Sequence, residues 1–364
     1  MKIKEFTRFL ESFADPLLQE SYDNCGLTVG DPEDTLEKVL VCLDVNEKVM
    51  DEAIQSGCQL IISHHPVIFR GLKKITVQSG TERIIIKAIK NNIALYALHT
   101  SLDNIISGIN GLLAEKAGLK NITALLPKKD LLRKLVTFCP LAETAKLREA
   151  LFKAGAGNIG NYDSCSFNAE GSGSFRANEN AHPFTGNINE LHFEKETRIE
   201  TIYPVYKENE VISALLEVHP YEEVAYDIYP LSNEFSKAGS GIIGELEKET
   251  SEEDFLSNLK EVLSIKHIRH SQFTFKKLKK IAICSGSGSF LIQEAIRKKA
   301  GLFVTADLKY HDFLEADGKI LLADIGHYES EQIVKELLFK ILTKNFNNFA
   351  VLISKMDLNP VYYY

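Results

Sequence analysis

The stretch "CQLIISHHPVIFRG" at residues 58–71 decides how the chain is interpreted, because it ends an apolar run with two adjacent histidines. The apolar run has the composition of a buried strand, and Pro66 stops it. A single histidine beside such a run is more often a hydrogen-bonded core residue than a ligand. Two in a row, His64 and His65, are harder to explain by packing, so the ends of the other apolar runs become informative.

Short apolar runs alternate with helical patterns in both terminal thirds of the chain. In the first third, "KVLVCLDV", "CQLIISHH" and "IALYALHT" alternate with the helical stretches "NEKVMDEAIQSG" and "TERIIIKAIKNN". In the last third, "KKIAICSGSGS", "LFVTADL" and "KILLADIGH" alternate with "FLIQEAIRKKAG" and "EQIVKELLFKILTKNF". Strands that are apolar on both faces predict an α/β fold with a largely parallel sheet, covered by helices on both sides. The two ends therefore resemble related α/β halves.

The middle of the chain has a different order of elements. It contains a long polar and glycine-rich segment that includes "SCSFNAEGSGSF", with strand and helix patterns on either side. The order β-α-β-β-α-β predicts an α+β domain of ferredoxin-like fold. We therefore expect an inserted domain at residues 128–236, between two parts of one α/β domain at residues 1–127 and 237–364.

Composition restricts the class of protein. The net charge of −8 over 364 residues argues against a nucleic-acid-binding surface, which needs clustered lysine and arginine. No run approaches the roughly 20 apolar residues of a membrane span, and the first residues lack the apolar region of a signal peptide. The six cysteines are scattered and form no CxxC pair. This usage predicts a cytoplasmic protein without a disulfide framework or a thiolate zinc site.

Imidazoles and carboxylates follow three of the apolar runs. The pairs are His64 and His65, His99 and Asp103, and His327 and Glu331. Ligands of open α/β sheets sit outside the carboxyl ends of the strands, so we expect these side chains to meet at one sheet edge. One such histidine would most simply be structural, but the joint occurrence of three polar pairs predicts a metal site.

The spacing of these residues favours two ions. His327 and Glu331 lie four residues apart, on one face of a helix if the helix begins near His327. His64 and His65 point to opposite sides of a strand, which suits two ions about 3.5–4 Å apart. We assign one of these histidines to each ion, Asp103 and His327 as further ligands, and Glu331 as a bridge.

The ligand types leave the identity of the metal open. Nitrogen and oxygen ligands without sulfur fit zinc, iron or manganese. His99 is either a further ligand or a hydrogen-bonding partner of one. We expect two divalent ions per subunit.

Three further motifs have two interpretations each. "CSGSGSF" (284–290), with Ser285 and Ser287, either binds a phosphate on backbone N–H groups or forms a tight turn with serine caps. "TADLKYHD" (305–312) either donates protons or binds an anion near the metals, or is a solvated loop; its candidates are Asp307, Lys309 and His311. "HPYEEVAYD" (219–227) is either a second ion site or the start of a strand.

These motifs resemble those of the Nif-three-like family, whose members carry the name GTP cyclohydrolase 1 type 2 homolog. The resemblance rests on "YDNCGLTVG" (22–30), "SHHPVIF", "LHTSLDN", "DLKYHD" and "GHYESE", which occur in the family's order, although Tyr22 stands where tryptophan is expected. It implies a dinuclear metal site in the α/β domain, carried by His64, His65, Asp103, His327 and Glu331. It also implies a homo-hexamer, and an insert similar to nitrogen-regulatory and cation-tolerance proteins.

We therefore expect a dinuclear-metal-dependent hydrolase that acts on a nucleotide or a phosphorylated metabolite, by analogy with the GTP cyclohydrolase name. A fold and a metal site do not fix a substrate. The alternative is a non-enzymatic scaffold that carries metal, or a regulatory assembly whose insert senses a small ligand. DNA binding is a third interpretation, which the acidic composition disfavours.

Overall fold

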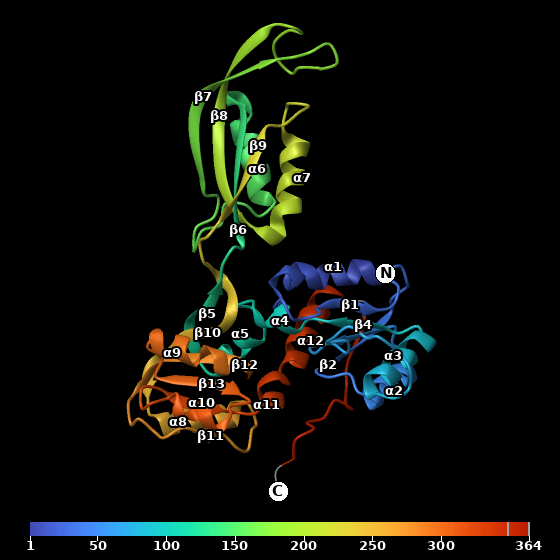
Figure 1. Ribbon diagram of the computed structural model, residues 1–364, viewed down its shortest axis with the longest axis vertical. Helices are drawn as coiled ribbons and strands as arrows, with labels where there is room; N and C mark the ends of the chain where they lie inside the picture. The colour runs from blue at the N-terminus through green and yellow to red at the C-terminus, as the bar shows by residue number, and fades with distance from the viewer. Residues whose placement is uncertain (348, 363–364) are drawn as a thin grey trace. The chain divides into compact units, whose positions relative to one another are not determined.

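The computed structural model describes residues 1–347 and 349–362, which form two compact units (Figure 1). The first unit joins Met1–Pro127 to Lys237–Tyr364, and the second is Lys128–Ser236. We call them the main unit and the insert. Each unit has hydrophobic core residues of its own. Within the described residues, no helix combines the length and the apolar character that a membrane span needs.

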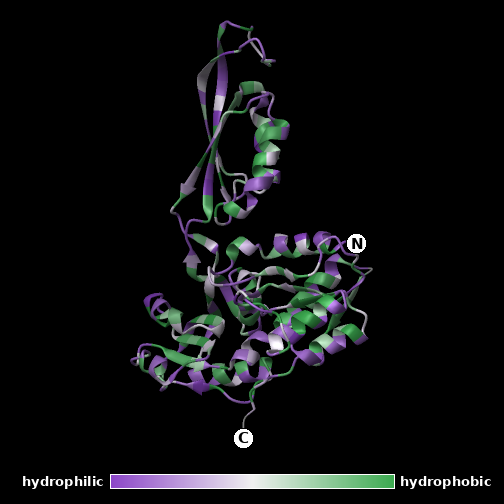
Figure 2. Cartoon of the chain, turned by 45° about the vertical axis from the view of Figure 1, so that its right-hand side comes forward, coloured by the Kyte–Doolittle hydropathy of each residue, from purple (hydrophilic) through white to green (hydrophobic). Residues whose placement is uncertain are grey.

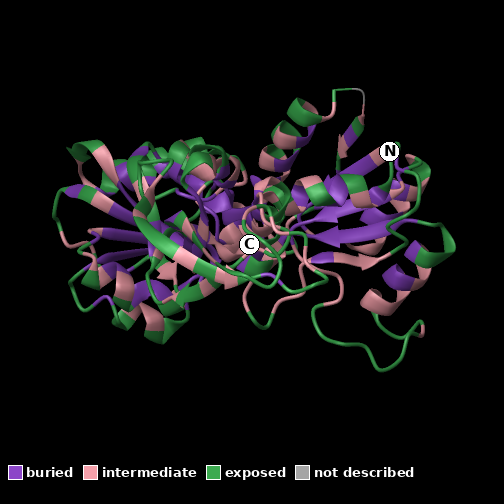
Figure 3. Ribbon diagram, turned by 90° about the horizontal axis from the view of Figure 1, so that it is seen from above, coloured by how far each residue is buried: buried purple, intermediate pink, exposed green. Residues whose placement is uncertain are grey.

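The first sheet of the main unit has five strands in the order β1-β4-β3-β2-β15. They are β1 (Gly26–Val29), β2 (Lys38–Cys42), β3 (Leu60–Ser63), β4 (Ala94–Ala97) and β15 (Ala350–Ile353). Neighbours from β15 to β4 are parallel, and β1 is antiparallel to β4. The strands of this sheet are mostly buried, as Figure 3 shows. The prediction of a parallel sheet is confirmed for β15, β2, β3 and β4, and the predicted burial for β2, β3 and β4, whereas β15 at the edge is partly exposed.

Helices complete the core around this sheet. α2 (Glu47–Gln55) and α3 (Gly80–Lys90) place their apolar residues in one cluster with residues of β2, β3 and β4. Each of these two helices starts at a polar N-cap: the Asn46 side chain accepts from Val49 N at 2.9 Å, and Ser79 accepts from Glu82 N at 3.2 Å. α12 (Val334–Asn345) contacts β2 and β15, and α1 (Ile3–Phe13) contacts β1.

The second sheet of the main unit has six strands in the order β11-β14-β13-β12-β10-β5. They are β5 (Leu119–Lys128), β10 (Phe235–Thr250), β11 (Arg269–His270), β12 (Leu278–Ser287), β13 (Leu302–Ala306) and β14 (Leu321–Asp324). β12, β13 and β14 are parallel, whereas β10 and β11 are antiparallel to β12 and β14. The other α-helices of the main unit, in its described residues, are α4 (His99–Asp103), α5 (Ile109–Lys116), α8 (Glu252–Val262), α9 (Ile292–Arg297), α10 (Tyr310–Leu314) and α11 (His327–Glu331).

The insert is one antiparallel sheet with two helices. Its elements are β6 (Leu132–Pro140), α6 (Thr144–Lys153), β7 (Ser166–Arg176), β8 (Leu191–Pro204), α7 (Glu208–Val218) and β9 (Tyr226–Leu231). The sheet order is β7-β8-β6-β9. Both helices lie on the same face of this sheet, where their leucines join the core (Figure 1). β7 and β8 are largely hydrophilic along their length (Figure 2), and most of β7 is exposed.

His219, at the end of α7, is a structural histidine. Its side chain is buried, its Nε2 donates to the carbonyl oxygen of Phe138 at 2.9 Å, and its Nδ1 accepts from Tyr221 N at 3.1 Å. Neither ring nitrogen is therefore available to an ion, and the imidazole must be neutral to make both bonds. Burial lowers the pKa of His219 below its ordinary value of 6.5.

We expect the insert to lose stability as the pH falls below 6.5, because unfolded His219 binds a proton more readily than folded His219. The contribution is complete above pH 6.5 and is lost as the pH falls towards the lower folded pKa. Hydrogen exchange of β6 and α7 amides, corrected for intrinsic rates, measures this between about pH 7.5 and about pH 5.5.

His219→Asn supplies the matched test, because asparagine does not titrate in this range. We expect His219→Asn to be less stable at neutral pH but to show a flatter pH dependence than the wild type. His182→Asn, at an exposed position, should keep the wild-type slope. An unchanged slope in His219→Asn would show that another group controls the loss.

Candidate metal centre

Four histidines gather within the main unit. His64 and His65 directly follow β3, His99 begins α4, and His327 begins α11. The ring centroid of His65 lies 4.9 Å from that of His64, 5.2 Å from His99 and 5.5 Å from His327. Residues far apart in the sequence therefore form one cluster of imidazoles.

These residues come from two sheets. The prediction that three strands would bring them to one sheet edge is wrong, because β3 and β4 belong to the first sheet and β14 to the second. The residues of the cluster instead follow the carboxyl ends of strands in both sheets. The predicted i, i+4 relation on one helix is confirmed, since His327 and Glu331 are the first and last residues of α11.

Glu331 lies at the centre of the group, and its side chain is only 4% exposed. Its Oε2 is 3.0 Å from Nε2 of both His65 and His327. Its Oε1 is 3.8 Å from Nε2 of His64, which is 3.6 Å from Oδ1 of Asp103. Ligand atoms of His64, His65 and Glu331 all lie within 4.8 Å of one another, which is close enough for a shared ion.

Several polar atoms of the cluster are buried without a hydrogen-bond partner among the residues that the structure describes. They are both ring nitrogens of His64, Oδ1 of Asp103, Oγ of Ser285 and Oε2 of Glu331. Oε2 lies 3.0 Å from Nε2 of His65 and of His327, so it forms ion pairs with these rings when they carry protons. Atoms that bind one ion at about 2.0–2.1 Å lie about 3.0–3.4 Å apart without bonding each other. The donor set therefore fits a metal ion, and it contains nitrogen and oxygen but no sulfur.

Carboxylates hold the opposite side of three of the rings. The Nδ1 atoms pair with Asp44 (His65, 2.9 Å), Asp23 (His99, 2.7 Å) and Asp307 (His327, 2.7 Å). A carboxylate that accepts the Nδ1 proton leaves the Nε2 lone pair free, which is the usual arrangement around metal-binding histidines.

The ionisation of the cluster follows from burial and from these carboxylates. Burial lowers the pKa of His64 to about 4. Burial also lowers the pKa of His65, but the adjacent Asp44 and Glu331 carboxylates outweigh it and raise the pKa to about 10. Glu331 raises the pKa of His327 to about 9. In the metal-free protein, protons on two imidazoles thus balance the charge of Glu331, and bound cations would displace them.

The two other carboxylates of the site shift in opposite directions. Burial and the nearby Glu331 charge raise the pKa of Asp103 well above its ordinary value. Burial would also raise the pKa of Asp23, but hydrogen bonds from His99 and Thr100 hold it well below its ordinary range. Asp23 is therefore a fixed negative charge behind the His99 ring.

The "SGS" segment at the end of β12 (285–287) encloses the Glu331 carboxylate. Gly286 has φ +59°, and a Cβ there would lie 2.2 Å from Oε1 of Glu331, so only glycine fits. Ser285 N donates to Asn110 Oδ1 at 2.7 Å, and Gly286 N donates to Ser330 Oγ at 2.9 Å. These two N–H groups are already used within the protein, so they are not available to bind a phosphate.

A cavity of about 130 Å³ lies beside the cluster. Among its lining residues are His99, Asp103, Ser285, Ser287, His327 and Glu331. Two aromatic residues of the same lining, Tyr22 and Phe290, are 62% and 63% exposed. Of the other candidates, Asp307 contacts His327, whereas Lys309 and His311 are exposed at the start of α10 and do not line this cavity.

Sequence reasoning named Asp307 but missed two other carboxylates behind the cluster, Asp44 and Asp357. Asp44 follows β2, so the rule that drew attention to His64 could have found it. Asp357 is buried and accepts from the backbone N–H groups of Leu43 at 2.6 Å and Asp44 at 3.3 Å, which fixes the segment carrying Asp44. No local pattern links Asp357 to β2, because more than three hundred residues separate them.

The chain belongs to the Duf34/NIF3 (NGG1p interacting factor 3) family. The family model matches residues 1–360, which is nearly the whole chain. A GTP cyclohydrolase 1 type 2 homolog of Halalkalibacterium halodurans is 40% identical over 344 residues, which cover 93% of this chain and 92% of that protein. The resemblance to the family seen in the sequence is therefore confirmed.

Solved structures of NIF3-related proteins have the same fold. A Bacillus cereus protein related to NIF3 is 37% identical, with a TM-score of 0.87 over 100% of this chain and 99% of that chain. A Staphylococcus aureus protein is 32% identical, with a TM-score of 0.77 over the same shares. The mixed α/β architecture with several sheets is thus that of the NIF3 family.

We expect Asp44→Ala to weaken binding of zinc or manganese by about 10–100-fold, because the ring of His65 loses the acceptor that orients it. Calorimetric titration of metal-stripped protein measures this. Asp44→Asn keeps an acceptor oxygen and should recover part of the affinity. Asp51→Ala, in α2, is the control, since Asp51 pairs with Lys87 away from the cluster. Equal affinities in Asp44→Ala and Asp51→Ala would rule out the positioning role.

Proposed function

We propose that the chain is a hydrolase that depends on two divalent ions, zinc, iron or manganese. The observation that carries this proposal is the position of Glu331, whose two oxygens face different partners. Oε2 is close to His65 and His327, and Oε1 faces His64, which lies near Asp103. Each set would hold one ion. Glu331 would belong to both sets, and each set would contain one of the two adjacent histidines, His64 or His65.

The residues around the ions would orient the ligands and bind the substrate. Two ions held by these residues would activate a water for attack and polarise the bond to be cleaved. Asp44 and Asp307 keep the Nδ1 protons of two ligands in place. His99 lines the cavity with its Nδ1 held by Asp23, so it can hold a proton for the leaving group at its other nitrogen. The unpaired hydroxyl of Ser285 can donate to a substrate oxygen.

The substrate class that we propose is a nucleotide or a phosphorylated metabolite. The name of the relatives supports a purine nucleotide. Tyr22 and Phe290 support it too, because exposed aromatic rings beside a polar cavity can stack on a base. A cavity of about 130 Å³ can admit only the reacting end of such a substrate. The remainder would lie against the two rings.

The alternative function is a metal-carrying or regulatory scaffold without turnover. The small size of the cavity favours it, since pockets for metabolites usually measure about 300–1,000 Å³. Free cysteines throughout the chain are consistent with a reducing compartment such as the cytoplasm for either function. A scaffold would bind ions and transfer them to an acceptor protein, but would hydrolyse nothing.

We expect Glu331→Gln to lose both bound metal and hydrolysis, because the neutral amide cannot balance two cations. The measurement is metal analysis of protein purified without added ions, together with a screen of nucleotides and phosphorylated metabolites. Glu329→Gln, on the same helix, should retain both properties. Metal-loaded wild type that hydrolyses no compound but donates its ions to an apo-acceptor would replace the hydrolase proposal with the scaffold.

We also propose that the protein is a homo-hexamer whose insert is ferredoxin-like. The observed strand order β7-β8-β6-β9, with both helices on one face, supports the ferredoxin-like description. The segment between β3 and α3 supports assembly, because it exposes four large apolar side chains: Phe69, Leu72, Ile75 and Val77. We expect light scattering to give six times the monomer mass, and a monomer mass at micromolar concentration would contradict this.

A further inference from the structure

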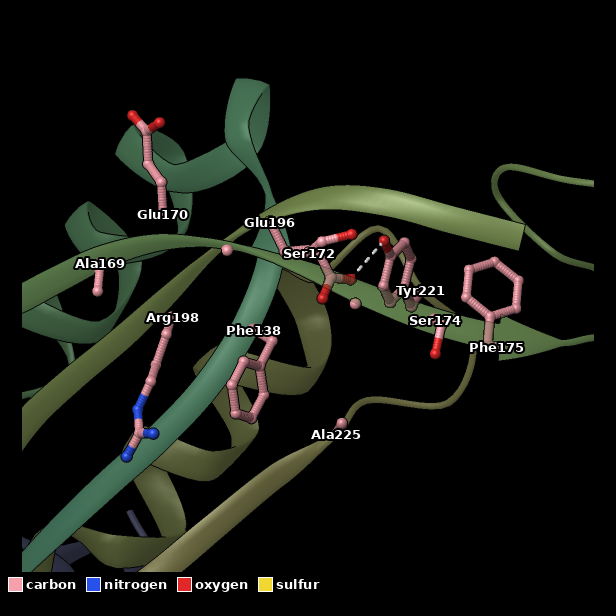
Figure 4. A pocket seen from close by; sticks show the side chains of 12 residues that line it. Phe138, Ala169, Glu170, Ser172, Ser174, Phe175, Glu196, Arg198, Tyr221 and Ala225 are labelled. Atoms are coloured by element: carbon pink, nitrogen blue, oxygen red, sulfur yellow. Dashed lines mark hydrogen bonds between the residues drawn. The ribbon is translucent and has the colours of Figure 1, made fainter. Parts of the chain in front are cut away.

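The insert contains a cavity of about 480 Å³ that is separate from the metal cluster (Figure 4). It lies on the sheet face opposite to the helices: Phe138 faces Arg198 across β6 and β8, while their sequence neighbours Cys139 and Ile199 join the core under the helices. Its volume is in the range of about 300–1,000 Å³ that is typical of sites for small molecules.

Glu196 is the buried member of the three charged residues that line this cavity, since Glu170 and Arg198 are exposed. Its side chain is buried, with 9% of the residue exposed, and its Oε1 accepts a hydrogen bond from Tyr221 Oη at 2.8 Å. Among the described residues, no lysine, arginine or histidine nitrogen lies within 4.0 Å of this carboxylate. Burying an ionised carboxylate without a cation costs desolvation free energy, and a positively charged ligand beside Glu196 would offset this cost.

The neighbouring arginine does not supply that positive charge. Arg198 pairs with Glu200 at 2.9 Å and lies over the ring of Phe138, 6.0 Å from its centroid. Figure 4 shows its guanidinium apart from the carboxylate of Glu196. An anionic ligand would therefore find no free cation here, whereas a cationic ligand would find Glu196.

Aromatic rings form much of the cavity wall. Phe138, Phe175 and Tyr221 all line it, and the ring of Phe175 lies 6.2 Å from that of Tyr221. Aromatic faces attract ammonium and guanidinium groups and pack against apolar bodies. His219 fixes two of these residues, since it bonds the carbonyl of Phe138 and the backbone N–H of Tyr221.

Glycines in β7 make the space that the carboxylate occupies. A Cβ at Gly173 would lie 2.1 Å from Oε2 of Glu196, so a larger residue would displace the carboxylate. Two residues earlier, a Cβ at Gly171 would meet nothing within 4 Å. Both glycines line the same cavity, but only Gly173 controls the position of the charge.

We propose that this cavity binds a small organic cation: an ammonium or guanidinium group carried on an apolar or aromatic body. The cationic group lies against Glu196 and Tyr221. The body lies between Phe138 and Phe175, over the glycines of β7. This site is independent of the metal cluster and of the proposed hydrolysis.

Three probes of one shape test the charge preference: phenethylamine, 2-phenylethanol and phenylacetate carry a positive, a neutral and a negative group. The chain contains no tryptophan, so Phe175→Trp gives a single fluorescent reporter in the cavity wall of the full-length protein. We expect phenethylamine to change this fluorescence in a saturable manner. The other two probes should bind at least about tenfold more weakly.

Substitutions in the reporter protein then identify the group responsible. Glu196→Gln keeps an acceptor for Tyr221 but removes the charge, and should weaken phenethylamine binding by at least about tenfold. Gly173→Ala should weaken it to a similar extent, while Asn168→Ala, at an exposed position of β7 outside the cavity lining, should leave it within about threefold of the parent. Circular dichroism checks folding, and if Glu196→Gln fails to fold, the two alanine variants decide.

Four results with these probes and variants would overturn the proposal. They are no saturable response to phenethylamine up to about 10 mM, equal binding of the three probes, unchanged binding in Glu196→Gln, and equal losses in the two alanine variants. A reporter signal that changes with protein concentration but not with the probe would instead indicate that a second copy of the chain covers this face. That result would overturn it as well.

Discussion

The buried carboxylate of Glu331 is the group on which the arrangement of the main unit depends. It lies 3.0 Å from ring nitrogens supplied by the first sheet, through His65, and by its own helix, through His327. Gly286, at the end of β12 in the second sheet, leaves the space that one of its oxygens needs. A buried carboxylate needs nearby positive or hydrogen-bonding groups. Because those groups come from the ends of both sheets, Glu331 holds the two sheet ends together. The same side chain therefore contributes both to the packing of the main unit and to the chemistry proposed for the site.

Local spacing determined the part of the site that the sequence could predict. Adjacent histidines at the end of a buried strand, and a histidine and a glutamate one helical turn apart, constrain their own geometry whatever the rest of the chain does. The structure keeps the expected local relation within each pair, and tertiary packing then brings the two pairs together. The alternation of apolar runs with helices likewise predicted the parallel neighbours of the first sheet, since β-strands buried on both faces need helices on both sides.

Long-range pairing determined the part that could not be predicted. β15, near the end of the chain, pairs with β2, and β10 pairs with β12, so that the terminal segments divide between two sheets. No spacing within either segment indicates this division. The same holds for Asp44 and Asp357, because an aspartate after a strand is common, and its role depends on which side chain tertiary packing places opposite it. The partners of the serine-rich turn were equally hidden, since Ser285 N donates to distant Asn110.

Two buried histidines show how the cluster differs from an ordinary polar part of the core. His219 uses both ring nitrogens in hydrogen bonds, so its burial costs little and it stabilises the insert. His64 is fully buried, yet neither of its nitrogens has a partner among the described residues. Each unpaired buried polar group costs about 1–3 kcal/mol, and four such atoms lie within this one cluster besides Oε2 of Glu331, which pairs with His65 and His327. His99 adds a strained backbone, with φ +27°. Proteins keep such unfavourable groups where the binding of a ligand compensates for them. The nitrogen and oxygen atoms gathered here are of the kind that bind divalent cations.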